Sequence, residues 1–127
     1  MMDTPAVARV LLADDHDLMR KLLRTVLSTR PGLEVVGEAA DGPEAVELAR
    51  TLEPDLVVLD LAMPGMDGLQ VANAVRAAQP DCMILVLSAF EAEHAAAAAI
   101  AAGADRYVEK AAGLHVAAEA AVELVNA

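Results

Sequence analysis

The chain has 127 residues, of which 57% are hydrophobic and 2% aromatic, and its formal net charge at pH 7 is −11. This length suits one compact domain, and the acidity excludes binding of a nucleic-acid backbone by the chain itself, because phosphate binding needs clustered lysine and arginine. Cys82 is the single cysteine, which excludes an internal disulfide and permits a reducing compartment.

The first half of the chain alternates between strand and helix patterns. After a polar start at Met1–Pro5, which lacks the basic and apolar regions of a signal peptide, an apolar run at 7–15 predicts a strand. A helix with one apolar stripe follows, and Pro31-Gly32 ends it. A second strand is predicted at 33–39, and Pro43 suits the first turn of a second helix. The stripe of the first helix consists of Leu18, Leu22, Leu23, Val26 and Leu27.

The second half repeats this alternation. Continuous apolar runs at 56–60 and 83–88 predict strands that are covered on both faces, and a shorter run at 105–110 predicts a fifth strand. A helix is predicted from Asp67-Gly68 to just before Pro80, another over the alanine-rich residues 91–102, and a last one over 114–125. No stretch is both long and charge-free enough to span a bilayer, so we expect a cytoplasmic protein without a membrane partner.

Five consecutive strand–helix units define the fold class that we expect. Such alternation predicts an α/β protein with a single doubly wound, parallel, five-stranded (βα)5 sheet and helices on both faces. The pattern fills residues 1–127, which predicts one domain. In open parallel sheets, ligands bind outside the carboxyl ends of the strands, so the residues that end each strand are the candidates for function.

Polar residues end four of the five predicted strands. Asp14 and Asp15 end the first, Asp60 the third, Ser88 the fourth and Lys110 the fifth. The Met-Pro-Gly turn behind Asp60 is expected to leave its carboxylate exposed. Three carboxylates at one edge repel one another unless a cation joins them, and hard oxygen ligands suit Mg²⁺, or Mn²⁺ in its place. A carboxylate beside such a metal and a lysine can be the nucleophile of phosphoryl transfer and form an acyl phosphate.

Each of these residues also has a plainer explanation. Asp14 or Asp15 could cap the first helix and Ser88 the fourth, and Lys110 could be a solvated charge. A helix cap is also the better explanation of Asp67. The other polar and sulfur side chains are predicted to be solvated histidines (His16, His94, His115), a buried or edge cysteine (Cys82) and packing methionines (Met63, Met66). The sequence contains neither a GxGxxG nor a GxxxxGK[ST] motif, which leaves a dinucleotide site or P-loop unsupported.

The joint pattern resembles the response-regulator receiver domain of bacterial two-component signalling over essentially the whole chain. The motifs are "LLADDH", "LDLAMPGMDG", "LVLSAF" and "GADRYVEK", and "GEAADGPEAVELA" is most similar to receivers of NarL/LuxR-type transcription regulators. The resemblance implies a phosphoacceptor at Asp60, a magnesium site, and a phosphate-pairing Lys110. Asp15 would bind the metal directly, Asp14 would assist through water, and Ala62 would offer its backbone carbonyl. Ser88 and Tyr107 would form the switch.

The resemblance also implies partners and an output. A sensor histidine kinase would donate the phosphoryl group, a homodimer could follow phosphorylation, and the only catalysis would be the domain's own phosphorylation and slow dephosphorylation. Regulators of this type bind DNA through a helix-turn-helix domain after the receiver, which would lie outside this chain. The alternative is a stand-alone regulator or phosphorelay intermediate. Ala111 follows the lysine where many receivers have a proline and a cis bond, which leaves the geometry of the Lys110–Ala111 bond open.

Three rival assignments are less consistent with the sequence. A phosphatase of the haloacid dehalogenase type needs a second aspartate two residues after the nucleophile, where "DLA" has Ala62. A flavodoxin-like module needs a hydroxyl-rich phosphate loop and aromatic residues that flank the flavin. A degenerate receiver used only for docking would lack one of the acids or the lysine.

Overall fold

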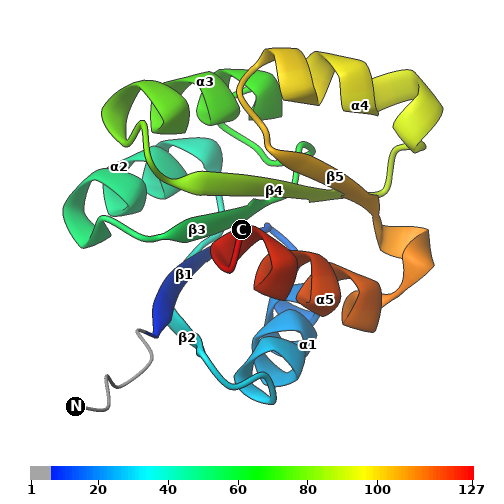
Figure 1. Cartoon of the computed structure of the whole chain (residues 1–127). Coiled ribbons are helices and arrows are strands. Elements are labelled where there is room, and N and C mark those ends of the chain that lie inside the picture. The colour runs from blue at the N-terminus through cyan, green and yellow to red at the C-terminus, as the bar shows by residue number, and fades with distance from the viewer. Residues whose placement is uncertain (1–6) are drawn as a thin grey trace.

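The computed structural model describes residues 7–127, and the polar start at Met1–Pro5 lies outside these residues. Within residues 7–127, five strands alternate with five helices, as the sequence pattern predicts (Figure 1). The strands are β1 (Ala8–Ala13), β2 (Leu33–Ala39), β3 (Leu56–Leu59), β4 (Met83–Ser88) and β5 (Arg106–Glu109). The helices are α1 (Asp17–Ser28), α2 (Gly42–Leu52), α3 (Gly68–Ala78), α4 (Ala92–Ala101) and α5 (Leu114–Val125), with a short 3₁₀ turn at Lys110–Ala112.

All strand pairs are parallel, and the strand order is β2-β1-β3-β4-β5. Helices α1 and α5 cover one face of the sheet, and α2, α3 and α4 cover the other (Figure 1). The chain order reverses between β1 and β3, and a parallel sheet opens a crevice at its carboxyl edge at such a switch point. The (βα)5 architecture predicted from the sequence is therefore confirmed, and it directs attention to the ends of β1 and β3.

The core explains why the central strands are continuously apolar. Alternate residues of β3 face opposite sides: Val57 and Leu59 pack with α2, α3 and α4, whereas Leu56 and Val58 pack with α1 and α5. A strand covered on both faces has no position that needs a polar side chain. The first polar residue after β3 is Asp60, at the point where the chain leaves the sheet.

Only part of the predicted apolar stripe of α1 is buried. Leu18 and Leu22 are 70% and 45% exposed and Val26 is partly buried, whereas Leu23 and Leu27 are buried. The five apolar residues span two adjacent rows of the helix, and the row of Leu23 and Leu27 is the one that packs against β1, β3 and α5. The sequence pattern could not distinguish the two rows because both are apolar.

The segment between β3 and α3 is fixed at its far end by Asp67 and Gly68. The Asp67 carboxylate accepts a hydrogen bond from the Leu69 N–H at 2.7 Å, and Gln70 completes a capping box, which confirms the predicted cap. A Cβ added to Gly68 would lie 2.5 Å from the Leu61 Cα and 2.6 Å from its carbonyl oxygen. Only glycine allows this backbone to approach the residue that follows Asp60.

We therefore expect Gly68→Ala to lower the unfolding free energy by about 2 kcal/mol, although alanine is ordinarily the better helix former. The added methyl group would push against backbone atoms, which cannot yield as a flexible side chain does. Urea denaturation of the two proteins would measure this change. An alanine variant as stable as the original protein would contradict the close packing.

Two further findings concern the backbone and the helices. The described residues contain only trans peptide bonds, so the Lys110–Ala111 bond, left open by the sequence, is trans here.

Within residues 7–127, no helix combines the length and the apolar character that crossing a bilayer requires.

Candidate functional site

The structure brings the predicted strand-end residues to one edge of the sheet. Asp14 and Asp60 follow the adjacent strands β1 and β3, Ser88 ends β4, and Lys110 follows β5. The Asp14 N–H donates to the Ala39 carbonyl at 3.0 Å, and the Asp60 N–H donates to the Ala13 carbonyl at 2.9 Å. These bonds extend the strand ladders by one residue and fix where both carboxylates leave the backbone.

The Asp60 side chain is not exposed as the sequence suggested. It is 3% accessible, because Lys110 lies over one of its oxygens and the segment after β3 folds back over the other. The Ala62 N–H donates to Asp60 Oδ1 at 3.0 Å, and Lys110 Nζ donates to Asp60 Oδ2 at 3.0 Å. The turn behind Asp60 therefore holds the carboxylate in place instead of presenting it to solvent.

Lys110 is the cation that joins the buried acids. Its Nζ lies 2.9 Å from Asp14 Oδ2 and 3.0 Å from Asp60 Oδ2, and its side chain is largely buried. Burial alone would lower the pKa of Lys110, but the hydrogen bonds to Asp14 and Asp60 and the charges of these carboxylates raise the pKa above its usual value. The lysine is therefore not the solvated charge that its plainer explanation assumed.

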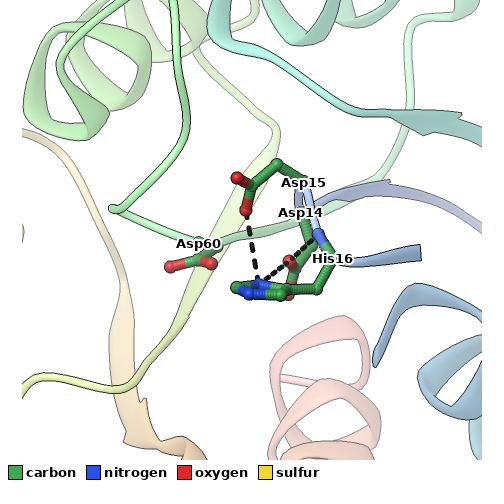
Figure 2. Close-up of side chains that lie close together, drawn as sticks. All are labelled: Asp14, Asp15, His16 and Asp60. Atoms are coloured by element: carbon green, nitrogen blue, oxygen red, sulfur yellow. Dashed lines mark hydrogen bonds and ion pairs between the residues drawn. The ribbon is translucent and has the colours of Figure 1, made fainter. Parts of the chain in front are cut away.

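Asp15 and His16 complete an open, acidic side of the site. Figure 2 shows both beside Asp14, with Asp60 facing them from the neighbouring strand end. The imidazole Nδ1 of His16 lies 3.5 Å from Asp14 Oδ1 and 3.4 Å from Asp15 Oδ1. His16 is exposed, as predicted, but its contact with the acids was missed, and its position directly after the acidic pair was the available signal.

The donor set fits a divalent cation of the magnesium type. One potential ligand atom from each of Asp14, Asp15, His16 and Asp60 lies within 4.8 Å of the others. Three of the four donors are carboxylate oxygens, and Mg²⁺ takes few protein oxygens and keeps several waters. Asp15 is partly solvent-accessible, so a hydrated ion could reach it. The arrangement can thus hold a hard cation next to the buried Asp60 oxygens.

Ser88 and Tyr107 meet at the backbone of Phe90. Ser88 is fully buried, and its Oγ accepts a hydrogen bond from the Phe90 N–H at 3.2 Å. The Tyr107 hydroxyl donates to the Phe90 carbonyl at 2.6 Å, while the Tyr107 ring is only partly buried. Two side chains from neighbouring strands therefore hold one residue of the loop before α4.

The plainer explanation as helix caps does not hold for Asp14 or Ser88. Asp14 Oδ1 accepts from the His16 N–H at 2.9 Å within the turn before α1, so it does not cap that helix. At α4, the Ala92 N–H donates to the Glu109 carboxylate at 2.6 Å, a partner from β5. Of the minor predictions, Cys82 is buried, and Met63 and Met66 pack against the core.

Comparisons with known proteins agree with this geometry. Residues 10–121 match the family model of the response regulator receiver domain. The nitrate/nitrite response regulator protein NarP of Escherichia coli (strain K12) is 44% identical over 102 residues, which cover 80% of this chain and 47% of that protein. The chain thus spans about half the length of this curated relative.

Two solved structures are similar to most of this chain. A LuxR-family two-component response regulator from Aurantimonas sp. SI85-9A1 superposes with a TM-score of 0.89 at 35% identity, covering 95% of this chain and 86% of that one. A response regulator protein from Burkholderia pseudomallei, solved with a phosphorylated aspartic acid, a calcium ion and citrate, gives a TM-score of 0.76 at 27% identity. This second match covers 86% of this chain and 63% of that chain.

Proposed function

The chain belongs to the response regulator receiver family of two-component signalling and is most similar to NarL/LuxR-type regulators, and from this premise we propose that Asp60 is its phosphoacceptor. The observation that carries the proposal is the Asp60 carboxylate at the end of β3, between Lys110 and the Asp14–Asp15 pair. The phosphorylated aspartic acid and calcium ion of the Burkholderia pseudomallei structure support it.

The chemistry is a transfer of a phosphoryl group between two proteins. An Asp60 oxygen attacks the phosphorus of a phosphohistidine on a sensor kinase; the P–N bond breaks, a P–O bond forms, and the imidazole leaves. Lys110 already lies beside one Asp60 oxygen and pairs with the incoming phosphoryl oxygens. Asp15, Asp60 and the Ala62 backbone carbonyl would hold Mg²⁺, with Asp14 assisting through water, and the ion would supply positive charge beside the Asp60 oxygens.

The output of the whole protein is part of this proposal. We infer that phosphorylation regulates transcription through a DNA-binding domain outside this chain. The 42% identity over 102 residues to the transcriptional regulatory protein LiaR of Bacillus subtilis (strain 168) supports the transcriptional output. A stand-alone regulator or phosphorelay intermediate is the alternative. The domain is a signalling module whose catalysis is confined to its own phosphorylation and slow dephosphorylation. A cytoplasmic location and a homodimer formed on phosphorylation stay predictions.

The proposed function is tested by intact mass after incubation with acetyl phosphate and Mg²⁺. The protein should gain one phosphoryl group, and chelation of the metal with EDTA should prevent the gain. A protein that remains unmodified with Mg²⁺ present, under conditions in which it is folded, would contradict the proposal.

Ser88 and Tyr107 are expected to carry the signal away from Asp60. A phosphoryl group adds strong acceptor oxygens and nearly two negative charges, so Ser88 should turn toward it and release the Phe90 N–H. Beryllofluoride, a phosphoryl mimic, should therefore change amide exchange between residues 88 and 110, with the loop before α4 affected most. Exchange in β2 provides the internal control. Equal protection with the mimic bound at Asp60 would rule out this switch.

A further inference from the structure

The turn between β1 and α1, residues Asp14–His16, carries two of the three acids of the site. The ladder between β1 and β2 ends with the pair Ala13 and Ala39. The carbonyl oxygen of Asp14 lies past this last pair and accepts a hydrogen bond from a side chain, Arg20 Nη1, at 2.6 Å. The Asp14 N–H extends the ladder by its bond to the Ala39 carbonyl, so the backbone that leads from Asp14 to Asp15 is held by the sheet on one side and by Arg20 on the other.

Arg20 holds this turn from the first turns of α1. Its guanidinium donates in three directions: to the Asp14 carbonyl, to Glu38 Oε1 at 2.9 Å and to Asp17 Oδ1 at 2.8 Å. The Arg20 side chain is 15% exposed, so water competes little for these bonds. The planar fork of arginine makes such a three-way contact without reorientation.

Glu38 is the anchor that keeps Arg20 in this orientation. It lies on β2, next to the end of the ladder, and pairs with both Arg20 and Arg24. Burial would raise the pKa of Glu38, but the hydrogen bonds to Arg24 and Arg20 lower the pKa below its usual value, so the anchor stays ionised at neutral pH. Arg24 is 50% exposed and contacts Glu38 from the outer side.

We propose that Arg20, oriented by Glu38, is a positioning residue that fixes the Asp14–Asp15 turn in the geometry that binds a divalent cation. The inference rests on the proposed function, because it concerns the same metal site. A positioning role for Arg20 and its electrostatic effect predict opposite changes in cation affinity when the guanidinium is removed. Removal of a positive charge beside an acidic site would tighten cation binding through Coulomb forces, whereas loss of the Asp14 contact would weaken it.

The experiment measures Mn²⁺ affinity from the free-ion signal in electron paramagnetic resonance. Arg20→Met keeps much of the apolar stem and removes the guanidinium, and we expect it to weaken Mn²⁺ binding roughly three- to tenfold, the effect of losing one such hydrogen bond. The matched control is Arg24→Met. Arg24 also pairs with Glu38, but its hydrogen bonds do not include Asp14. This variant should bind Mn²⁺ as tightly as the original protein or slightly more tightly.

A double variant removes the remaining ambiguity. Arg20→Met with Glu38→Gln removes one positive and one negative charge, so the local net charge is unchanged. It should bind Mn²⁺ as weakly as the single variant, and circular dichroism of each protein checks that it is folded. If the original protein takes up no Mn²⁺, the metal site of the proposed function fails and this inference with it. If that protein binds and both Arg20 variants bind equally well or better, only the positioning role is overturned.

Discussion

An Asp60→Asn protein is expected to gain no phosphoryl group from acetyl phosphate and Mg²⁺ under conditions that label the original protein completely. The amide that replaces the carboxylate is uncharged and a poor nucleophile, so the attack on phosphorus is lost and the metal contact is weakened. Lys110 keeps Asp14 as a partner, so the variant should remain folded. Intact mass spectrometry measures the fraction of protein that carries a phosphoryl group, and for Asp60→Asn we expect this fraction to be zero.

The matched control is Asp67→Asn. Asp67 belongs to the same segment between β3 and α3, but it is exposed and caps α3, and asparagine caps a helix about as well as aspartate. This control should be labelled like the original protein. If instead Asp60→Asn is still labelled, the acceptor is another residue, and peptide mapping of the modified protein would locate it.

Replacement of Lys110 by alanine is expected to have the largest effect on stability. Asp14 and Asp60 are both buried, and without Lys110 two carboxylates of the same sign would lack the cation that joins them. Loss of one partner from a buried ion pair typically costs about 3 kcal/mol or more. We expect a fall of about 3 kcal/mol in the unfolding free energy, measured by urea denaturation at pH 7 in EDTA.

Two comparisons make this result specific. Lys21 is the other lysine of the chain and is exposed on α1, so Lys21→Ala should change stability by less than about 0.5 kcal/mol. Added Mg²⁺ should restore part of the stability lost by Lys110→Ala, because a cation that binds only the folded state stabilises it. A Lys110→Ala protein as stable in EDTA as Lys21→Ala would show that Lys110 does not stabilise the buried acids.

The pH dependence of the Lys110 contribution follows from its raised pKa. A lysine whose pKa is higher in the folded than in the unfolded protein stabilises the fold fully below the unfolded value of 10.5. This stabilisation is lost only as the pH rises through the folded value, which lies at strongly alkaline pH. The comparison at pH 7 therefore measures the whole effect.

The strand ends could be predicted from the sequence for two reasons. An apolar run marks a strand within a few residues, and the carboxyl ends of parallel strands always meet at one edge of the sheet. Continuous apolar runs located β3 and β4, and the parallel order brought Asp14, Asp60, Ser88 and Lys110 to one edge. The burial of Asp60 could not be predicted in the same way. It depends on Lys110, fifty residues later in the chain, and on the Ala62 N–H, whose direction is set by the turn.

The missed residues have a common physical cause. Arg20 acts through a backbone carbonyl, and a carbonyl carries no sequence signal. His16 contacts the acids through the geometry of the turn that they share, and Glu109 contacts the N-terminus of α4 across space. Leu18 and Leu22 are exposed because the row of Leu23 and Leu27 faces the sheet and α5, and the apolar pattern of α1 alone does not indicate which row does so.

The contacts of Phe90 make this position suitable for an optical probe. Its N–H is bonded to Ser88 and its carbonyl to Tyr107, yet Phe90 is 53% exposed and its position should therefore tolerate a larger aromatic group. The chain contains no tryptophan, so an indole introduced by Phe90→Trp would be its single tryptophan emitter. Fluorescence from that one site could follow the arrival of a phosphoryl group on Asp60 in real time, without any label attached to the protein.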